Sequence, residues 1–198
     1  MLEFITVIWN YIYNYASENQ LVTVIQLITM IPYGIAFWRK KKKNVLLWVA
    51  ISCLLFGFGY LLSSAYSGII IAAGTFVTTI IGISFGKKAN VTLKVRFVAF
   101  FLMVGITIVL SLLIEQNSIM WLVLIAGFFD YFAYIVFREY DRGMHFVLIL
   151  SQITLVIYEV FFFLYLFAIL DFVTMIIIFA HLREISHEVK IINKQTVC

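Results

Sequence analysis

The sequence predicts an all-α membrane protein with seven transmembrane helices. Of its 198 residues, 64% are hydrophobic and only 12% are charged, whereas a soluble domain carries about 25% charged residues because its surface faces water. The apolar residues come in long runs, and a helix needs about 20 of them to cross the hydrocarbon core. Every Lys and Arg lies outside these runs apart from Arg96, which is at the beginning of the fourth. Composition, run length and cation placement therefore all indicate that the partner of most of the surface is the lipid bilayer.

Seven runs are long enough to be read as membrane spans. In chain order they are residues 21–38, 45–63, 68–86, 95–114, 119–137, 144–163 and 166–182. The last two spans follow each other with almost no residues between them. They are read as two because the apolar stretch from Phe146 to Leu182 is too long for one span. A tight external turn is therefore predicted at residues 163–165.

Residues 4–17 precede the first span and have a different pattern. These fourteen residues make only about 21 Å of helix, which is short for a span. Thr6, Asn10, Asn14 and Ser17 recur at helical spacing and form a polar stripe along one face. The segment is also rich in Trp and Tyr, so an interfacial amphipathic helix on the outer leaflet is predicted. A tilted eighth span is the alternative.

The cations determine the predicted orientation. All fourteen Lys and Arg residues lie in four places along the chain. These are after the first span, around the connection between the third and fourth, between the fifth and sixth, and after the seventh. The opposite connections and the first twenty residues contain none. Because cytoplasmic loops are enriched in Lys and Arg, the amino terminus is predicted to be outside and the carboxy terminus cytoplasmic. No cleavable signal peptide is expected, since no cation precedes Arg39.

The first three spans and the last three look alike. Tyr33 and Tyr131 are 98 residues apart, and so are Tyr60 and Tyr158. A linking fourth span would keep the two halves parallel, which gives a 3+1+3 arrangement of two triple-helix repeats known from transporters. Five regions are therefore expected: an external interfacial segment at 1–20, a first repeat at 21–88, a linking helix at 89–118, a second repeat at 119–184 and a cytoplasmic tail at 185–198.

Several residues carry a resemblance to a known superfamily. Pro32 stands seven positions before Arg39, and KKKN follows; this resembles the first-helix signature of the SWEET and PQ-loop (MtN3-like) superfamily. The segment FGFGYLLSSAYSG, and VIYEV followed twelve residues later by Asp171, are similar to YgjV-type bacterial inner-membrane proteins within that group. The resemblance covers about residues 22–184. It implies a SWEET-like fold in a bacterial inner membrane and the movement of a sugar, vitamin or similar small polar solute. The position matching Pro32 in the second half is Asp130.

Three carboxylates lie inside predicted spans: Asp130, Glu159 and Asp171. A charged carboxylate at mid-bilayer costs about 2.5–3.5 kcal/mol on insertion scales, and no span contains a Lys or Arg to pair with it except Arg96, which is at the cytoplasmic end of the fourth. Helix geometry places Asp130 near the midplane and the other two at a shared depth of roughly 6–8 Å. If Glu159 and Asp171 face each other, they should share one proton. The alternative is that each carboxyl is neutral and hydrogen-bonded, or reaches the outer headgroups.

These positions define the candidate site. Asp130 is predicted to contact substrate, with Tyr131, Gln152 and Gln26 as further substrate-binding residues, and Glu159 and Asp171 are predicted to form an external proton or cation gate. Pro32 removes a backbone hydrogen bond and is predicted to be a hinge, with a tolerated packing kink as the alternative.

Other kinds of site are not expected. The three His residues have no metal-site spacing, the two Cys residues indicate no disulfide framework, and neither a cofactor nor a nucleic-acid partner is expected. Whether the chain forms a homo-oligomer stays open.

These observations leave two candidate functions and argue against a third, an enzyme. The carboxylates favour a transporter of a small polar solute, proton-coupled through these groups. The single proline favours the alternative of a non-transporting membrane receptor, scaffold or immunity-type protein on the same fold. An enzyme is not expected, because no nucleophile with its base and no metal-binding cluster can be identified.

Overall fold

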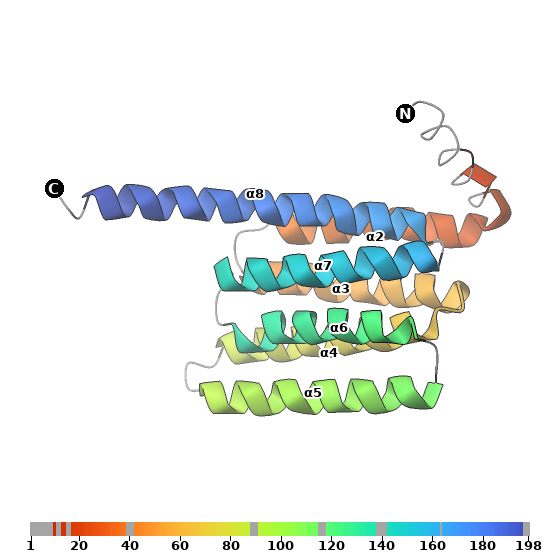
Figure 1. Ribbon diagram of the computed structural model, residues 1–198, viewed down its shortest axis with the longest axis horizontal. Helices are drawn as coiled ribbons and strands as arrows, with labels where there is room; N and C mark the ends of the chain where they lie inside the picture. Colours follow the sequence, from red (N-terminus) through yellow and green to blue (C-terminus); the bar gives the residue numbers. More distant parts are fainter. Residues whose placement is uncertain are drawn as a thin grey trace.

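The chain is helical throughout the part that the computed structural model describes, residues 10, 13–14, 17–38, 42–87, 91–114, 118–137, 142–162 and 164–195. Its helices are α2 (Gln20–Trp38), α3 (Lys42–Leu62), α4 (Tyr66–Lys87), α5 (Leu93–Ile114), α6 (Met120–Tyr131), the π-helix η1 (Phe132–Val136), α7 (Arg142–Phe161) and α8 (Tyr165–Gln195) (Figure 1). The amphipathic segment expected at 4–17 falls largely outside the described residues.

Five of these helices are long and apolar enough to cross a membrane. They are Lys43–Leu62, Tyr66–Gly86, Leu93–Ile114, Arg142–Phe161 and Tyr165–Arg183. Two further apolar helices, Gln20–Ala36 and Met120–Val136, are shorter. Large apolar side chains such as Phe58, Phe101 and Leu113 point outward and are more than half exposed, as expected for a surface that faces lipid tails. The expectation of a multi-pass helical membrane protein is therefore confirmed.

The helices form two groups of three, with α5 beside them. Sequential neighbours pack together, α2 with α3 and α3 with α4 in the first group, and α6 with α7 and α7 with α8 in the second. The groups meet where α2 packs on α8 and α4 packs on α6. Helix α5 packs on α4, α6 and η1 at one edge of the molecule (Figure 1). The middle helices α3 and α7 thus face each other across the interior.

Two short turns connect antiparallel helices on one side of the bundle. Between α3 and α4, Ser64 adopts a left-handed conformation with φ of 55°, and the amide of Ala65 donates to the carbonyl of Tyr60 at 2.9 Å. Between α7 and α8, the amide of Leu164 donates to the carbonyl of Glu159 at 2.8 Å. The second turn confirms the predicted break in the long apolar stretch.

Helix α8 continues well past the predicted seventh span. It runs from Tyr165 to Gln195 as one element of 31 residues, and its carboxy-terminal part extends beyond the other helices (Figure 1). Most of the region expected to be a cytoplasmic tail is therefore a continuation of the last helix.

The helix expected at 119–137 is not α-helical throughout. After Tyr131 it changes to the π-helix η1, whose last carbonyls are bound by a side chain of α5. Arg96 is only 3% exposed, and its Nη1 donates to the carbonyls of Ile135 at 3.1 Å and Phe137 at 3.3 Å. Its Nη2 donates to the carbonyl of Phe85, near the end of α4, at 3.4 Å. Because the last carbonyls of a helix lack intrahelical donors, Arg96 links α5 to the ends of α4 and η1.

Replacing Arg96 with alanine is expected to lower stability by about 2–3 kcal/mol, because hydrogen bonds from a charged donor to buried acceptors are lost. Thermal unfolding in detergent micelles measures this, with Lys94→Ala as the control because Lys94 is exposed on the same helix. Equal melting temperatures for the two variants would contradict this role of Arg96.

Candidate functional site

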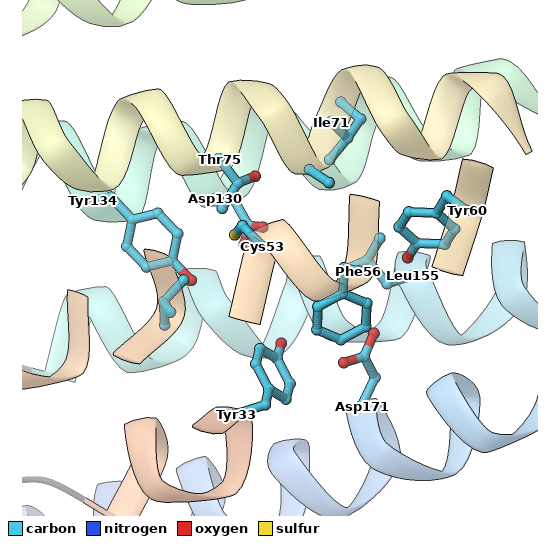
Figure 2. A pocket seen from close by; sticks show the side chains of 12 residues that line it. Tyr33, Cys53, Phe56, Tyr60, Ile71, Thr75, Asp130, Tyr134, Leu155 and Asp171 are labelled. Atoms are coloured by element: carbon cyan, nitrogen blue, oxygen red, sulfur yellow. The ribbon is translucent and has the colours of Figure 1, made fainter. Parts of the chain in front are cut away.

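A small cavity lies in the interior between the two groups of helices. Its volume is about 40 Å³, and every helix except α5 contributes to its wall. The lining residues are Tyr33, Val49, Cys53, Phe56, Tyr60, Ile71, Ala72, Thr75, Asp130, Tyr134, Leu155 and Asp171. All of them except Leu155 are buried. In Figure 2, Tyr33 and Asp171 approach from α2 and α8 on one side, and Ile71 and Thr75 approach from α4 on the other.

The predicted carboxyl pair is brought together beside this cavity, whose lining includes Asp171 but not Glu159. Glu159 is fully buried and Asp171 is 1% exposed, and the two carboxyls are close enough to interact directly. The Tyr60 hydroxyl donates a hydrogen bond to Oε1 of Glu159 at 2.8 Å. The tight turn between α7 and α8 places the two acids on neighbouring helices at the same level, as the residue count predicts. Their function as a gate stays a prediction.

Two tyrosines that are 98 residues apart in the sequence meet beside the acids. The rings of Tyr60 on α3 and Tyr158 on α7 are 6.1 Å apart in an edge-to-face arrangement. The Tyr158 hydroxyl lies 3.0 Å from Oγ of Ser67 and accepts from the amide of Gly68 at 3.1 Å. A Cβ at Gly68 would lie 2.7 Å from the Tyr60 ring, so the close approach of α4 to this pair requires glycine. The tyrosines thus fix the spacing of the two helix groups near Glu159.

Asp130 lies in the cavity wall on α6. It is 5% exposed, it is near the Ser151 side chain, and its Oδ1 has no hydrogen-bond partner among the described residues. Asp171 lines the same cavity from α8. Neither oxygen of Asp171 has a hydrogen bond of standard geometry in the described part of the chain. One buried interior therefore holds all three acids that the sequence places inside spans.

The cavity lacks a positive charge to compensate these acids. Among the residues described as lining it, none is Lys, Arg or His. The buried Arg96 is occupied by backbone carbonyls at the end of η1. Charged carboxylates in an apolar interior are costly unless they are paired, so the carboxyls must carry protons, contact water or bind a cation.

The other expected substrate-binding residues take different positions. The Tyr33 hydroxyl donates to Oε1 of Gln152 at 3.1 Å, so Gln152 positions a residue of the cavity wall. Gln26 is 1% exposed, and neither amide atom has a hydrogen-bond partner among the described residues, but Gln26 does not line the cavity. Pro32 is buried within α2, which continues on both sides of it.

Tyr131 is directed toward α5 instead of the cavity lining. Its hydroxyl lies 3.1 Å from Oγ1 of Thr107, and it lines a separate apolar hollow formed by residues of α5 and α6. The side chain crosses α4 at Gly74, where a Cβ would overlap the hydroxyl. Tyr131 therefore binds α5 to the second group of helices, and the neighbouring Asp130 is the residue that faces the interior.

Gly74→Ala is expected to destabilise the protein, because the added Cβ displaces Tyr131 and breaks its contact with Thr107. A loss of about 1–3 kcal/mol is typical of overpacking. The double variant with Tyr131→Phe should recover part of that loss. Gly105→Ala is the matched control, because a Cβ there meets no atom within 4 Å. Thermal unfolding of the four proteins in micelles tests this, and an unaffected Gly74→Ala variant would contradict it.

Sequence reasoning missed several residues of the cavity wall. Cys53, Phe56, Thr75 and Tyr134 line it but were not predicted as site residues. Thr75 had the clearest signal, since it is a hydroxyl residue within an apolar run, and its Oγ1 is buried without a partner among the described residues. The aromatic residues had no such signal, because 18% of the chain is aromatic.

Comparison of the chain with protein families, with characterised proteins and with solved structures finds no match. The candidate function therefore depends on the geometry of the cavity and its acids.

Proposed function

We propose that the protein is a transporter of a small polar solute, coupled to protons through the carboxyls of its interior. The observation that carries the proposal is the placement of Asp130, Glu159 and Asp171 in one buried interior, with no cation lining the cavity in the described part of the chain. Acids inside membrane proteins are rare, and they typically mark ion pathways and proton relays.

The helix packing supports a 3+1+3 arrangement of two parallel repeats. A two-fold axis parallel to the helices would exchange α2 with α6, α3 with α7 and α4 with α8. The observed contact of α2 with α8 would then be equivalent to that of α6 with α4, and both occur. In this arrangement α5 is the linking helix, and all seven apolar helices cross the membrane. The cavity lies between the repeats, where transporters of this plan hold their substrates.

The orientation of this arrangement rests on charge. The connections rich in Lys and Arg are cytoplasmic, so the amino terminus is outside and the carboxy terminus inside, in a bacterial inner membrane. The turn between α7 and α8 then lies on the outer side, and the Glu159–Asp171 pair lies just below it. Pro32 acts as a hinge in α2.

One observation favours the alternative, a non-transporting receptor, scaffold or immunity-type protein. A cavity of about 40 Å³ with a nearly fully buried wall has room for only a few water molecules. A transporter must therefore open this interior during its cycle.

Uptake into proteoliposomes separates the two functions. Purified protein is reconstituted and tested with a panel of sugars, vitamins, amino acids and amines, without a proton gradient and with one imposed in either direction. Accumulation of one solute that depends on the gradient supports the proposal. Failure to move any solute, together with stable binding of a partner protein, would support the alternative.

A further inference from the structure

We infer that the central cavity is a binding site for a small organic ammonium ion, which contacts Asp171 and Asp130 and takes the place of a proton. The inference rests on the proposed function and names a class of solute for it. It starts from the polar atoms that face the cavity without partners.

These atoms are mostly hydrogen-bond acceptors. Both oxygens of Asp171 and Oδ1 of Asp130 lack a hydrogen bond of standard geometry in the described part of the chain, as does Oγ1 of Thr75. Tyr33 and Glu159 lie beside Asp171. Thr75 is 5% exposed and is on α4, across the cavity from Asp171 (Figure 2). A ligand that satisfies this set must be rich in donors. A sugar brings acceptors along with its donors, whereas an ammonium group is donor-only and also compensates the charge.

The wall around these atoms suits a cation with an apolar substituent. Four aromatic residues, Tyr33, Phe56, Tyr60 and Tyr134, line the cavity. Aromatic faces attract ammonium groups, and such rings form the recognised cages for them. The rings of Tyr33 and Phe56 are 5.1 Å apart and edge-to-face, so two ring surfaces of different orientation border the same space. Val49, Ile71 and Ala72 complete an apolar wall.

The cavity volume limits the size of the ion. A buried water needs about 10–15 Å³ of such space, so a cavity of about 40 Å³ holds roughly three non-hydrogen atoms. Ethylammonium, with two carbons and one nitrogen, is of this size. A hexose would require the helices to move apart before it could enter.

Competition between the ion and a proton follows from the groups that face the acids. These are Tyr33 from α2, Cys53 and Tyr60 from α3, Asp130 from α6, Tyr134 from η1, and Tyr158 and Glu159 from α7; the residues of α4 in the wall do not ionise. No group in this set supplies a positive charge. Binding of an ammonium ion to a protonated carboxyl therefore releases that proton, with one positive charge entering and one leaving. The exchange is electroneutral.

Calorimetry of the purified full-length protein in micelles tests this. Ethylammonium is titrated in two buffers of different ionisation enthalpy, and ethanol, which has the same number of non-hydrogen atoms, serves as the neutral isostere. We expect saturable binding of ethylammonium, release of about one proton per ion, and about tenfold tighter binding for each unit rise in pH. Asp171→Asn should abolish binding, whereas Glu18→Gln should not, since Glu18 is exposed outside the bundle.

Three results would overturn the inference: equal binding of ethanol, binding without proton release, or binding of sodium ions with exclusion of ethylammonium. If Asp171→Asn does not fold, Thr75→Val tests the same site and should weaken ethylammonium binding. The results that would overturn the proposed transport function differ from those that would overturn the ammonium site. Binding with proton release but no flux in proteoliposomes would overturn transport and leave the site, whereas flux of a neutral solute without ammonium binding would overturn only the inference.

Discussion

Asp130→Asn is expected to reduce proton-driven uptake by at least about tenfold, equivalent to about 1.4 kcal/mol of lost interaction. The variant keeps the size of the side chain and its ability to hydrogen-bond, but it cannot carry a charge or exchange a proton. Asp130 lies in the cavity wall, and its Oδ1 has no hydrogen bond of standard geometry in the described part of the chain, so this oxygen is available to a ligand. Uptake of the solute identified by the panel is measured in proteoliposomes at equal protein density.

Two controls accompany that experiment. Glu18→Gln removes a carboxyl that is exposed outside the bundle and should transport normally. Thermal unfolding of Asp130→Asn shows whether the variant is folded, and a neutral amide in this interior should not lower its melting temperature much, because the buried charge is what is costly there. A folded Asp130→Asn protein with unchanged uptake would refute the role of Asp130.

The double variant Glu159→Gln with Asp171→Asn is expected to remove the response of uptake to a proton gradient. The two carboxyls lie close together, and none of the residues described as lining the adjoining cavity is a cation, so they should share protons as one unit. Each single variant leaves one titratable group and should change the pH dependence of uptake. The double variant leaves none at this level, and its uptake should be the same with and without the gradient.

Tyr60→Phe provides the matched control for the pair. It removes the 2.8 Å hydrogen bond to Glu159 while both carboxyls and the ring packing remain. Loss of one hydrogen bond to a charged or shared-proton carboxyl is worth about 1.5–3 kcal/mol at most, so the pH dependence should shift but persist. Gradient-driven uptake by the double variant, equal to that of the unmodified protein, would show that the pair is not the coupling site.

The three acids show which properties of a side chain in a membrane helix can be predicted by counting residues. The rise per residue is constant, so depth follows from position, and the shared level of Glu159 and Asp171 could be predicted because a very short turn joins their helices. The direction in which a side chain points is harder to predict from the sequence. Tyr131 follows Asp130 directly, yet it points to Thr107 on α5, since consecutive residues on a helix face different ways.

The sequence alone determined that this chain is a multi-pass helical membrane protein, which of its stretches form apolar helices, and which three acids are inside them, but not the length of α8 or the change to η1. These properties depend on local hydrophobicity and on the cost of burying charge, which are fixed by residue type. The tertiary structure decided which residues those acids contact. The hydrogen bond of Tyr60 with Glu159 and that of Arg96 with Ile135 in η1 join residues 99 and 39 positions apart, and the cavity wall joins residues from six helices and η1. Such contacts depend on which face each helix turns to its neighbours, and a chain that is apolar on nearly every face carries little signal of that choice.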